Sequence, residues 1–556
     1  MEKSFTKIFW QAIIVGLLTG LIVVAFRLGI ENLFSFIMAK FYTKPLLFLV
    51  ITTLGGLLAG LLVYIFAPET SGSGIPYVKM SLLRSGKLIR VRTIFVKFFA
   101  GVIGIGTGLS LGREGPSVQL GAGAGSFVGK LFKLSGNNRD KLIASGAGAA
   151  IGATFNAPIA GTLFVLEELI HKFTPSMLFP TLVATVTSAS IARYFLGANP
   201  AFNISIPAIG ISPSVVIVCI ILGLISGVLG VLFSKTIFFM NGNIAKIKFP
   251  NYCKPAIAGL ITGLAGLIIP YVLSSGNGSV EKLLLNDFPI ALVCIIFLAK
   301  FIITPICFAS GAAGGIFLPM LMLGSFLGYI TGYFANDFGA GVNLTAIASL
   351  GMAGFLSSVA RTPLTAVVMV FEMTGGYECI LPLMLVSAIA DLTAEKMNHK
   401  PIYAKLVVNQ YKNADVNLSD KTTIQDIMTQ NVKTFKNNAK IQDILKIMEQ
   451  EGHNAYPICD KKDRLSGIIT KSDIEDVLVD NKMKSITVSR ILDTNPVTVY
   501  PDDNLYTAYY RLHENSTEWA IVINKEQKVL GIVTRKDIIN NEYIHLTLTL
   551  SCKARE

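Results

Sequence analysis

The chain has 556 residues, of which 52% are hydrophobic and 15% are charged, and its mean hydropathy is +0.59. An ordinary soluble domain carries roughly 25% charged residues, so a single soluble globule is excluded and most of the chain belongs in lipid. The formal charge of +13 would suit nucleic-acid binding, but Lys and Arg enriched in the cytoplasmic loops of a membrane protein give the same value, and we favour that explanation.

Glycine and cysteine refine this class. The 50 glycines show no collagen period and suit membrane helices that are tightly packed or broken. The seven cysteines are scattered and form no CxxC pair. They indicate structural apolar residues, and neither a metal site nor a disulfide framework is expected.

The first apolar stretch runs from Ile8 to about Ile30 and lacks a small-residue cleavage site, so it predicts a retained helix and not a secretory signal. Several later stretches are too short, or too interrupted by Gly and Pro, for a plain span of about 20 residues. They predict half-helices that end inside the membrane. The later stretches lie at about 46–67, 94–111, 115–134, 141–170, 176–196, 213–235, 254–275, 288–308, 315–336, 343–372 and 380–395.

Residues recur at an offset of 203 to 205, which predicts two related halves at about 46–196 and 254–395. The matched positions pair Gly72 with Gly276, Gly74 with Gly278, Gly112 with Gly315, Pro116 with Pro319, Gly121 with Gly324, Gly125 with Gly328, Gly129 with Gly332, Pro158 with Pro363, and Glu167 with Glu372. Broken helices at corresponding positions of two membrane halves point to a transport site where the halves meet.

Three breaks in the apolar stretches are rich in Gly and Pro: GSGIP at 72–76, GREGP at 112–116 and GGIFLP at 314–319. Each contains a proline suited to the first turn of a new helix, so backbone N–H groups should be free at a helix N-terminus. Such an end attracts a desolvated anion through its amide donors and a partial charge of roughly +0.5, without a Lys or Arg that would trap the anion. The alternative is that these are ordinary helix kinks.

Glu114 lies inside the second break, in a segment with no other acid. A carboxylate at this depth is expensive unless it has a partner or a function. Aimed at free amides, an ionised Glu114 would occupy the anion site as a tethered anion, and protonation would release it. One side chain could then gate an anion path and carry a proton. The alternative is a structural ion pair with Arg113.

Three acids end apolar stretches: Glu167 and Glu168 in the first half, and Glu372 in the second. An acid near a helix end can simply lie at the water interface, where it escapes most of the desolvation cost, and this alternative stays open for all three. Ser73 and Tyr403 carry hydroxyls of a kind that usually pack or face an interface, and the residues alone do not select Tyr403.

Composition changes near Leu406, where Lys, Asp and Asn become frequent and the apolar runs shorten to strand length. We expect a membrane domain at 1–406, a linker at 407–422, a cytoplasmic domain at 423–545 and a tail at 546–556. The cytoplasmic domain holds two copies, at about 423–480 and 487–545, that repeat at 64 residues. Each copy predicts strand, helix, strand, strand and helix, with Thr470 or Thr534 capping the last helix.

The three breaks, followed by KPIY at 400–403, resemble the motifs of the CLC family of chloride channels and chloride/proton antiporters over roughly residues 8–406. The resemblance implies an all-α polytopic membrane protein of two inverted repeats of tilted and broken helices. It implies a homodimer with one anion path per subunit. By this resemblance, the central chloride is bound by the hydroxyls of Ser73 and Tyr403. More external positions are faced by the backbone N–H groups of Gly115, Ile316, Phe317 and Leu318.

By the same resemblance, Glu114 matches the external gating glutamate and Glu168 the internal proton-transfer glutamate. The internal position is typically acidic in antiporters and not in channels, so Glu168 favours antiport. Ser73 stands where nitrate-preferring relatives carry proline, which suggests chloride, and GREGP and GSGIP argue against the fluoride-exporting branch. Leu318 replaces a smaller residue of many relatives, and little effect is expected because the contact there is made by the backbone.

The C-terminal domain resembles a pair of CBS domains, a small α/β module that in many proteins binds adenine nucleotides between its two copies. Residues that match its ribose-binding motif are Thr470, Asp473, Thr534 and Asp537. Residues that could assist with phosphate charge are Lys471, Arg535 and Lys536. The alternative is that each Thr and Asp only caps a helix, which needs no ligand.

Together these features predict a chloride/proton antiporter of the cytoplasmic membrane, with both termini in the cytoplasm and a tail that senses an adenine nucleotide. A basic loop should face the same cytoplasm and consists of Arg84, Lys87, Arg90, Arg92 and Lys97.

Two alternatives to this prediction remain. One is a passive gated chloride channel of the same family, in which Glu114 only gates the path. The other is a membrane receptor that signals through the CBS tail. The chain carries no HExxH, GxSxG or Walker lysine motif in context, so no enzyme is expected.

Overall fold

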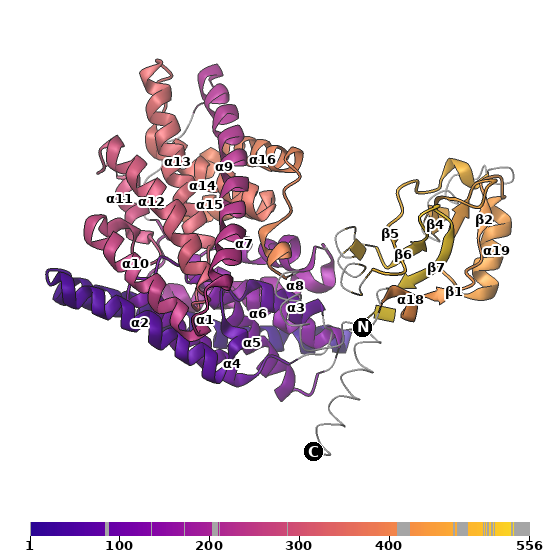
Figure 1. Cartoon of the computed structure of the whole chain (residues 1–556), viewed down its shortest axis with the longest axis horizontal. Helices are drawn as coiled ribbons and strands as arrows, with labels where there is room; N and C mark the ends of the chain where they lie inside the picture. Colours follow the sequence, from indigo (N-terminus) through magenta and orange to yellow (C-terminus); the bar gives the residue numbers. More distant parts are fainter. Residues whose placement is uncertain are drawn as a thin grey trace. The chain divides into compact units, whose positions relative to one another are not determined.

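The protein is described by a computed structural model that covers residues 2–83, 88–134, 136–171, 173–202, 210, 212–285, 287–407, 423–470, 473–474, 487–503, 505, 508, 511–512, 515, 517–534 and 537–538. The chain divides into two compact units, Met1–Val407 and Val408–Glu556. The first unit holds the long helices, and the second holds the strands (Figure 1).

Seven helices in the described part of the chain are long and apolar enough to cross a membrane. Others, such as the nine-residue α3 and the eight-residue α11, are too short to span a bilayer and fit the predicted half-helices. The helices of the first unit are α1 (Glu2–Phe41), α2 (Pro45–Phe66), α3 (Ile75–Leu83), α4 (Val91–Gly106), α5 (Glu114–Leu131), α6 (Asn137–Phe155), α7 (Pro158–Phe164), α8 (Pro175–Leu196), α9 (Pro213–Lys246), α10 (Lys254–Ile268), α11 (Asn277–Leu284), α12 (Ile290–Ala309), α13 (Phe317–Asp337), α14 (Leu344–Ala360), α15 (Pro363–Thr374) and α16 (Ile380–Lys396).

Two predicted apolar stretches, 141–170 and 343–372, are each split into two helices. In the first stretch, α6 is followed by the C-cap residue Asn156, which has a φ of +57°, and α7 starts at Pro158. In the second stretch, α14 is followed by the C-cap residue Arg361, which has a φ of +60°, and α15 starts at Pro363. A left-handed C-cap followed by a proline at the first helical position stops one helix and starts the next. The repeat therefore extends to the turn geometry.

Glycines hold the helices of each repeat in close contact. A Cβ at Gly121 in α5 would overlap the carbonyl oxygen of Gly146 in α6, and a Cβ at Gly324 in α13 would overlap that of Gly351 in α14. Backbone contact of this kind is typical of membrane helices, where packing replaces the hydrophobic driving force. The same small residues at the same offset thus build the same helix pair twice.

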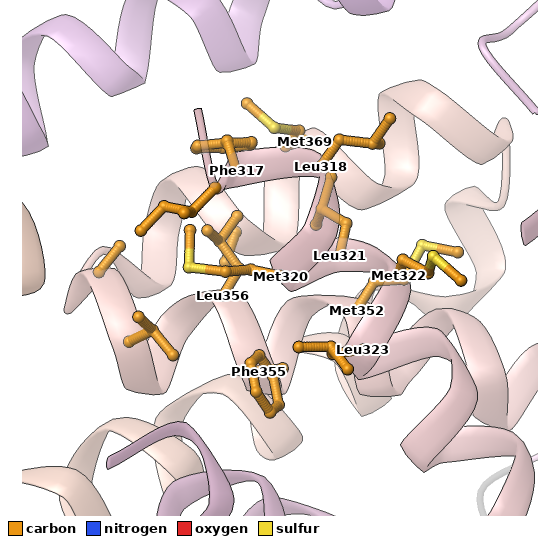
Figure 2. Packing of buried hydrophobic residues seen from close by; sticks show 14 of the residues in the cluster. Phe317, Leu318, Met320, Leu321, Met322, Leu323, Met352, Phe355, Leu356 and Met369 are labelled. Carbon is orange, nitrogen blue, oxygen red and sulfur yellow. The ribbon is translucent and has the colours of Figure 1, made fainter. Parts of the chain in front are cut away.

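Large apolar side chains fill the space between α13, α14 and α15. Figure 2 shows Phe317 and Leu318 at the start of α13 beside Met369 of α15, with Leu356 of α14 below them. All four side chains are at most 1% exposed. The first turn of α13 is therefore fixed by packing, which also fixes the directions of its backbone N–H groups.

The second unit contains two small sheets. One has the strand order β1-β7-β6-β5 and the other β2-β3-β4. In each, a parallel pair (β2 with β3, β5 with β6) adjoins an antiparallel pair (β3 with β4, β6 with β7), so the two copies repeat as predicted. The elements are α18 (Ile424–Ile427), β1 (Thr429–Gln430), β2 (Phe435–Lys436), α19 (Ile441–Glu451), β3 (Ala455–Cys459), β4 (Leu465–Thr470), β5 (Thr498–Val499), β6 (Trp519–Ile523) and β7 (Val529–Thr534).

Candidate anion and proton site

The first break places Ser73 just before α3. Gly72 and Gly74 have φ angles of +71° and +95°, a region that favours glycine, and α3 begins at Ile75. A Cβ at Gly74 would also lie 2.7 Å from Oε1 of Gln119. Glycine is therefore needed on both sides of Ser73 to turn the chain and start the helix.

Lys97 supports the first break from α4. Its side chain is fully buried, and Nζ donates to the carbonyl oxygens of Thr70 at 2.8 Å and Gly72 at 2.6 Å. The prediction that Lys97 belongs to a basic cytoplasmic loop is therefore wrong, because its ammonium satisfies backbone carbonyls inside the protein. Arg90 and Arg92 are exposed, and the rest of that predicted loop, Arg84 and Lys87, lies outside the described residues.

Lys300 repeats this arrangement in α12. It is also fully buried, and Nζ donates to the carbonyl oxygens of Val272 at 3.0 Å and Ser274 at 2.8 Å. Lys300 lies 203 residues after Lys97, within the offset of the two halves. Sequence reasoning missed this pair, although the repeat offset was a signal that could have found it.

The second and third breaks meet across the two repeats. Gly112 and Gly315 exchange two backbone hydrogen bonds, each with an N···O distance of 2.7 Å. This bridge brings the start of α5, at Glu114, to the start of α13, at Phe317. Because the first N–H groups of a helix have no partner within it, two sets of donors converge here. Gly115, Ile316, Phe317 and Leu318 are all buried at this point.

Glu114 is fully buried where the two helix starts meet. Its Oε2 accepts a hydrogen bond from the backbone N–H of Leu318 at 3.2 Å, and its Oε1 has no partner among the described residues. Arg113 forms its ion pair with Glu31, at 2.6 Å, so the alternative of a structural ion pair between Arg113 and Glu114 is not observed among the described residues. The Glu114 carboxylate thus lies at one of the amides that the family resemblance assigns to chloride.

The two hydroxyls that the family resemblance assigns to the site, Oγ of Ser73 and the phenol oxygen of Tyr403, are buried and lack a hydrogen-bond partner among the described residues. A Cβ at Gly115 would overlap Ser73 Oγ, so Ser73 packs directly on the first turn of α5. Tyr403 lies close enough to Glu114 and Glu168 to interact with both electrostatically. A buried hydroxyl without a partner costs roughly 1–3 kcal/mol, so these unpartnered groups indicate a place for a polar ligand.

Glu168 lies in a π-helical turn, Val165–Ile170, that directly follows α7. Its side chain is 1% exposed and pairs with Lys79 of α3, whose side chain is 3% exposed, at an Nζ···Oε1 distance of 2.6 Å. Glu168 Oε2 is buried and has no partner among the described residues. For Glu168, the alternative of an acid at the water interface is therefore wrong. The sequence did not single out Lys79, because nothing in the chain order brings it beside Glu168.

Glu167 and Glu372 cap each other's helices across the repeats. The Glu167 carboxylate accepts from the N–H groups of Leu364 at 3.1 Å and Thr365 at 2.7 Å, in the first turn of α15. The Glu372 carboxylate accepts from the N–H groups of two residues in the first turn of α7, Ile159 at 3.2 Å and Ala160 at 2.8 Å. Both acids thus cap a helix of the opposite repeat. The alternative that they are simple interface acids is therefore wrong.

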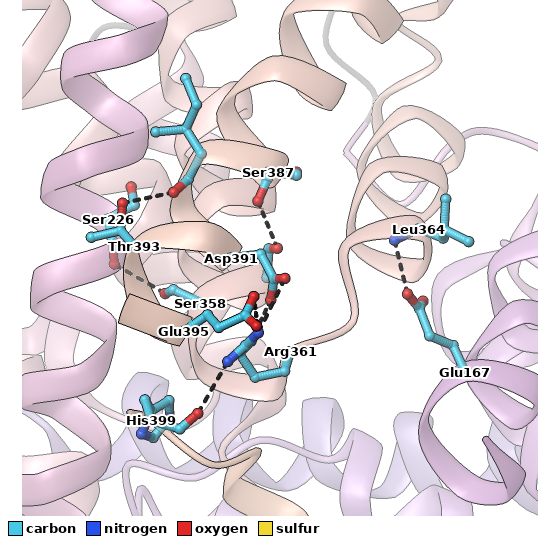
Figure 3. Close-up of polar contacts among 12 residues, drawn as sticks. Glu167, Ser226, Ser358, Arg361, Leu364, Ser387, Asp391, Thr393, Glu395 and His399 are labelled. Atoms are coloured by element: carbon cyan, nitrogen blue, oxygen red, sulfur yellow. Dashed lines mark hydrogen bonds and ion pairs between the residues drawn. The ribbon is translucent and has the colours of Figure 1, made fainter. Parts of the chain in front are cut away.

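Arg361 ties the segment before Tyr403 to α14 and α16. Its guanidinium pairs with Asp391 and with Glu395, and one amino group donates to the carbonyl oxygen of His399 at 3.1 Å (Figure 3). The chain becomes helical again over 402–407, which carries Tyr403. The sequence did not single out Arg361, whose role depends on residues 30 or more positions away.

In the second unit, the residues predicted to hold a ribose form two matching capping boxes. Thr470 donates to Asp473 Oδ2 through N–H at 2.8 Å and through Oγ1 at 2.7 Å. Thr534 donates to Asp537 Oδ2 in the same way at 2.9 and 2.7 Å. The capping alternative is thus observed. In the described contacts each carboxylate accepts through Oδ2. The predicted phosphate contacts, Lys471, Arg535 and Lys536, lie outside the described residues.

This geometry defines a class of protein: a membrane protein whose broken helices bring free backbone amides and a buried carboxylate together at a candidate anion site. Residues 55–395 match the model of the family described as voltage gated chloride channel, and residues 424–480 and 488–542 match the CBS domain. The chain belongs to the CLC family of chloride channels and transporters, multi-pass membrane proteins that are not enzymes, and it carries two CBS domains. The predicted family and fold class are confirmed.

Similar proteins include exchange transporters. Over 426 residues, the chain is 35% identical to the "H(+)/Cl(-) exchange transporter ClcA" of Yersinia pestis bv. Antiqua (strain Angola), with 73% of this chain and 88% of the relative covered. The solved structure of a slow cyanobacterial Cl−/H+ antiporter is 30% identical, with a TM-score of 0.68 over 73% of this chain and 99% of that one. A eukaryotic CLC transporter, 19% identical, superposes with a TM-score of 0.67 over 97% of this chain and 99% of that one, which shows the fold alone.

Proposed function

We propose that this protein exchanges chloride for protons across the cytoplasmic membrane. Glu114 alternates between two states. Ionised, it occupies the anion path as a tethered anion; protonated, it leaves the path and admits chloride. Glu168 passes protons between the path and the cytoplasm.

One observation carries this proposal: the Glu114 carboxylate lies on the Leu318 amide where α5 and α13 start. Amide donors at helix N-termini bind an anion of either kind, a carboxylate or a halide, without a fixed cation. A chloride ion and the ionised side chain therefore compete for the same donors. Because protonation removes the carboxylate's charge, proton uptake at Glu114 and chloride entry are linked.

The unpartnered hydroxyls support chloride as the ion at a second position. Ser73 Oγ and Tyr403 OH are O–H donors that are buried without partners among the described residues. A monovalent anion would accept from both and recover part of the cost of burying them. The relatives at 35% and 30% identity are named as exchangers of these ions, which favours the same pair here.

Glu168 supports exchange over passive flow. A gated channel needs only Glu114, whereas an exchanger needs a second proton-binding group on the route to the other side. Glu168 is 1% exposed and keeps one oxygen unpartnered among the described residues, so it is a buried acid with room for a proton. Such a residue inside a membrane domain is expensive and is retained for a function.

The test is simultaneous measurement of chloride and proton flux from purified protein in liposomes. An outward chloride gradient should drive protons inward when no proton gradient is imposed. A proton gradient should in turn drive chloride in the opposite direction. Chloride flux with no proton movement would establish the channel alternative. Truncation after Tyr403 should leave flux measurable; the receptor alternative predicts no turnover in either form.

The proposal extends to assembly and regulation. We expect a homodimer with one path per subunit and both termini in the cytoplasm, and domain boundaries at 1–406, 407–422 and 423–545. We also expect an adenine nucleotide at the CBS pair, where Asp473 and Asp537 would accept from ribose hydroxyls. Both residues keep Oδ1 outside their capping boxes, so capping and ribose binding are compatible.

A further inference from the structure

Lys79 and Glu168 form a buried ion pair that links two parts of the site. Lys79 is the fifth residue of α3, the helix that begins directly after Ser73. Glu168 belongs to the π-helical turn after α7. The two side chains are 3% and 1% exposed and their charged atoms are 2.6 Å apart. Ser73 thus lies two residues before this short helix, and the counter-ion of Glu168 lies at its middle.

The second repeat lacks this pair. With the offset of 204 that matches Gly72 to Gly276, Lys79 corresponds to Leu283. With the offset of 205 that matches Glu167 to Glu372, Glu168 corresponds to Met373. Leu283 and Met373 are both fully buried. The fold is therefore satisfied by apolar side chains at these two positions, and packing alone does not call for a lysine and a glutamate.

Three other titratable groups lie near the pair: Glu167, Tyr403 and His171. Glu167 binds the first turn of α15, and the Tyr403 phenol lies within electrostatic reach of Glu168. His171, at the end of the π-helical turn, lies within electrostatic reach of Lys79. Lys79 is the one cation that pairs with Glu168 among the described residues.

We propose that Lys79 is a positioning residue for the proton step at Glu168. Its ammonium holds Oε1, so the unpartnered Oε2 is the oxygen that takes up and gives off the proton. The lysine keeps its own proton throughout: a proton added to Oε2 turns the carboxylate into a neutral acid, and its release restores the ion pair. The positive charge of Lys79 also lets ionised Glu168 coexist with chloride at Ser73, because the pair as a whole is neutral.

This inference rests on the proposed exchange of chloride for protons. Lys79→Gln leaves Glu168 without a counter-charge, and an unpaired buried carboxylate is costly. We expect the ratio of protons to chloride moved in liposomes to fall several-fold, while chloride flux continues. Lys79→Arg keeps the charge and should hold the ratio within about twofold of the original, since guanidinium also pairs with carboxylate.

Lys282→Gln is the matched control. Lys282 lies in α11, the corresponding helix of the second repeat, but it is exposed and stacks over the Tyr271 ring at 5.3 Å. The ratio should be unchanged in this variant. An unchanged ratio in Lys79→Gln would overturn the inference, and so would a loss in Lys79→Arg as large as in Lys79→Gln, because then the charge is not what matters.

A second measurement avoids reliance on a variant that fails to fold. Glu168→Gln leaves the lysine charge uncompensated near Ser73, so the purified protein should bind chloride several-fold more tightly by calorimetry. The double variant Lys79→Gln/Glu168→Gln removes both charges, is expected to fold because a neutral pair replaces a buried ion pair, and should return chloride affinity toward the original value. Equal affinity in the single and double variants would overturn the inference.

The failure of this inference and the failure of the proposed function are distinguishable. If the unaltered protein moves chloride without protons, the exchange proposal fails before any variant is compared. If the unaltered protein exchanges both ions and the variants behave alike, exchange stands and the role of Lys79 falls.

Discussion

The two repeats of the membrane unit share a scaffold. Each has a buried lysine that donates to two backbone carbonyls: Lys97 does so at the first break, and Lys300 does so at the corresponding segment of the second half. Each has a glycine contact between its paired helices and a glutamate that caps a helix of the other half. These shared features are all contacts to the backbone, so they hold the helix breaks in place whichever side chains lie around them.

The halves differ in the side chains that line the proposed anion path. In the first repeat, Ser73, Lys79, Glu114 and Glu168 are buried; the corresponding residues of the second repeat are Asn277, Leu283, Phe317 and Met373. The second repeat instead supplies the Leu318 amide that Glu114 contacts. A scaffold can be symmetric, but a second carboxylate in place of Phe317 would repel Glu114 where the two helix starts meet. The comparison thus teaches that the duplicated backbone builds the site and one half carries its acids.

The largest expected effect comes from replacing Glu114, whose counterpart in the second repeat is Phe317. Glu114→Gln should abolish proton movement, to the level of empty liposomes, while chloride continues to pass, because a neutral amide can neither carry a proton nor compete as an anion. Asp337→Asn, an exposed position at the end of α13, is the control and should leave both fluxes unchanged. Normal coupling in Glu114→Gln would remove this residue from the mechanism.

The shared scaffold is tested by matched glycine variants. Gly121→Ala and Gly324→Ala each force a Cβ against a carbonyl oxygen of the neighbouring helix. Each should destabilise the protein by about 1–3 kcal/mol, seen as earlier thermal unfolding in detergent. Gly242→Ala in α9 has no atom within 4 Å of the added carbon and should not destabilise. Loss in only one of the two repeat variants would show that the halves do not share this support.

The reciprocal caps should behave alike and differ from their neighbour Glu168. Glu167→Gln and Glu372→Gln each weaken charged hydrogen bonds to a helix N-terminus, so each should cost about 1–2 kcal/mol of stability. The ratio of protons to chloride should stay unchanged in both, whereas Glu168→Gln should lower it. Thermal unfolding and liposome flux measure the two effects, with exposed Glu378→Gln as the control. A loss of coupling in Glu372→Gln would contradict the division between scaffold and proton route.

The smallest effect is expected in the second unit, where the two copies are again compared. Asp537→Ala removes a cap worth about 1 kcal/mol and should also weaken binding of an adenine nucleotide several-fold. Asp473→Ala tests whether the other copy contributes equally, and Asp502→Ala, an exposed position, is the control. Binding is measured by calorimetry on the whole protein. Unaltered nucleotide binding in Asp537→Ala would refute its ribose contact.

Much of this architecture was predictable because it depends on local chemistry. Glycine tolerates a positive φ and proline suits the first turn of a helix, so the two residue types together mark helix breaks. The nearly fixed offset between matching residues reveals the duplication. The place of Lys97 was not predictable in this way. A lysine near other basic residues suggests a loop, and only the fold shows that backbone carbonyls of the first break reach its ammonium.

Glu167 and Glu168 show the limit most clearly. They are adjacent in the chain and chemically identical, and the residues alone left both as acids near a helix end. In the structure, Glu167 binds the first turn of α15, whereas Glu168 pairs with Lys79, which is 89 positions away in the chain.

By itself, the sequence determined the membrane class, the duplicated halves, the breaks and the presence of an acid at the second break, because each follows from composition or from spacing along the chain. Tertiary structure alone decided which amide meets Glu114, which lysine neutralises Glu168 and which glutamates serve as caps. Those partners come from segments distant in the chain, and the energy of a buried charge depends on the groups that surround it in space.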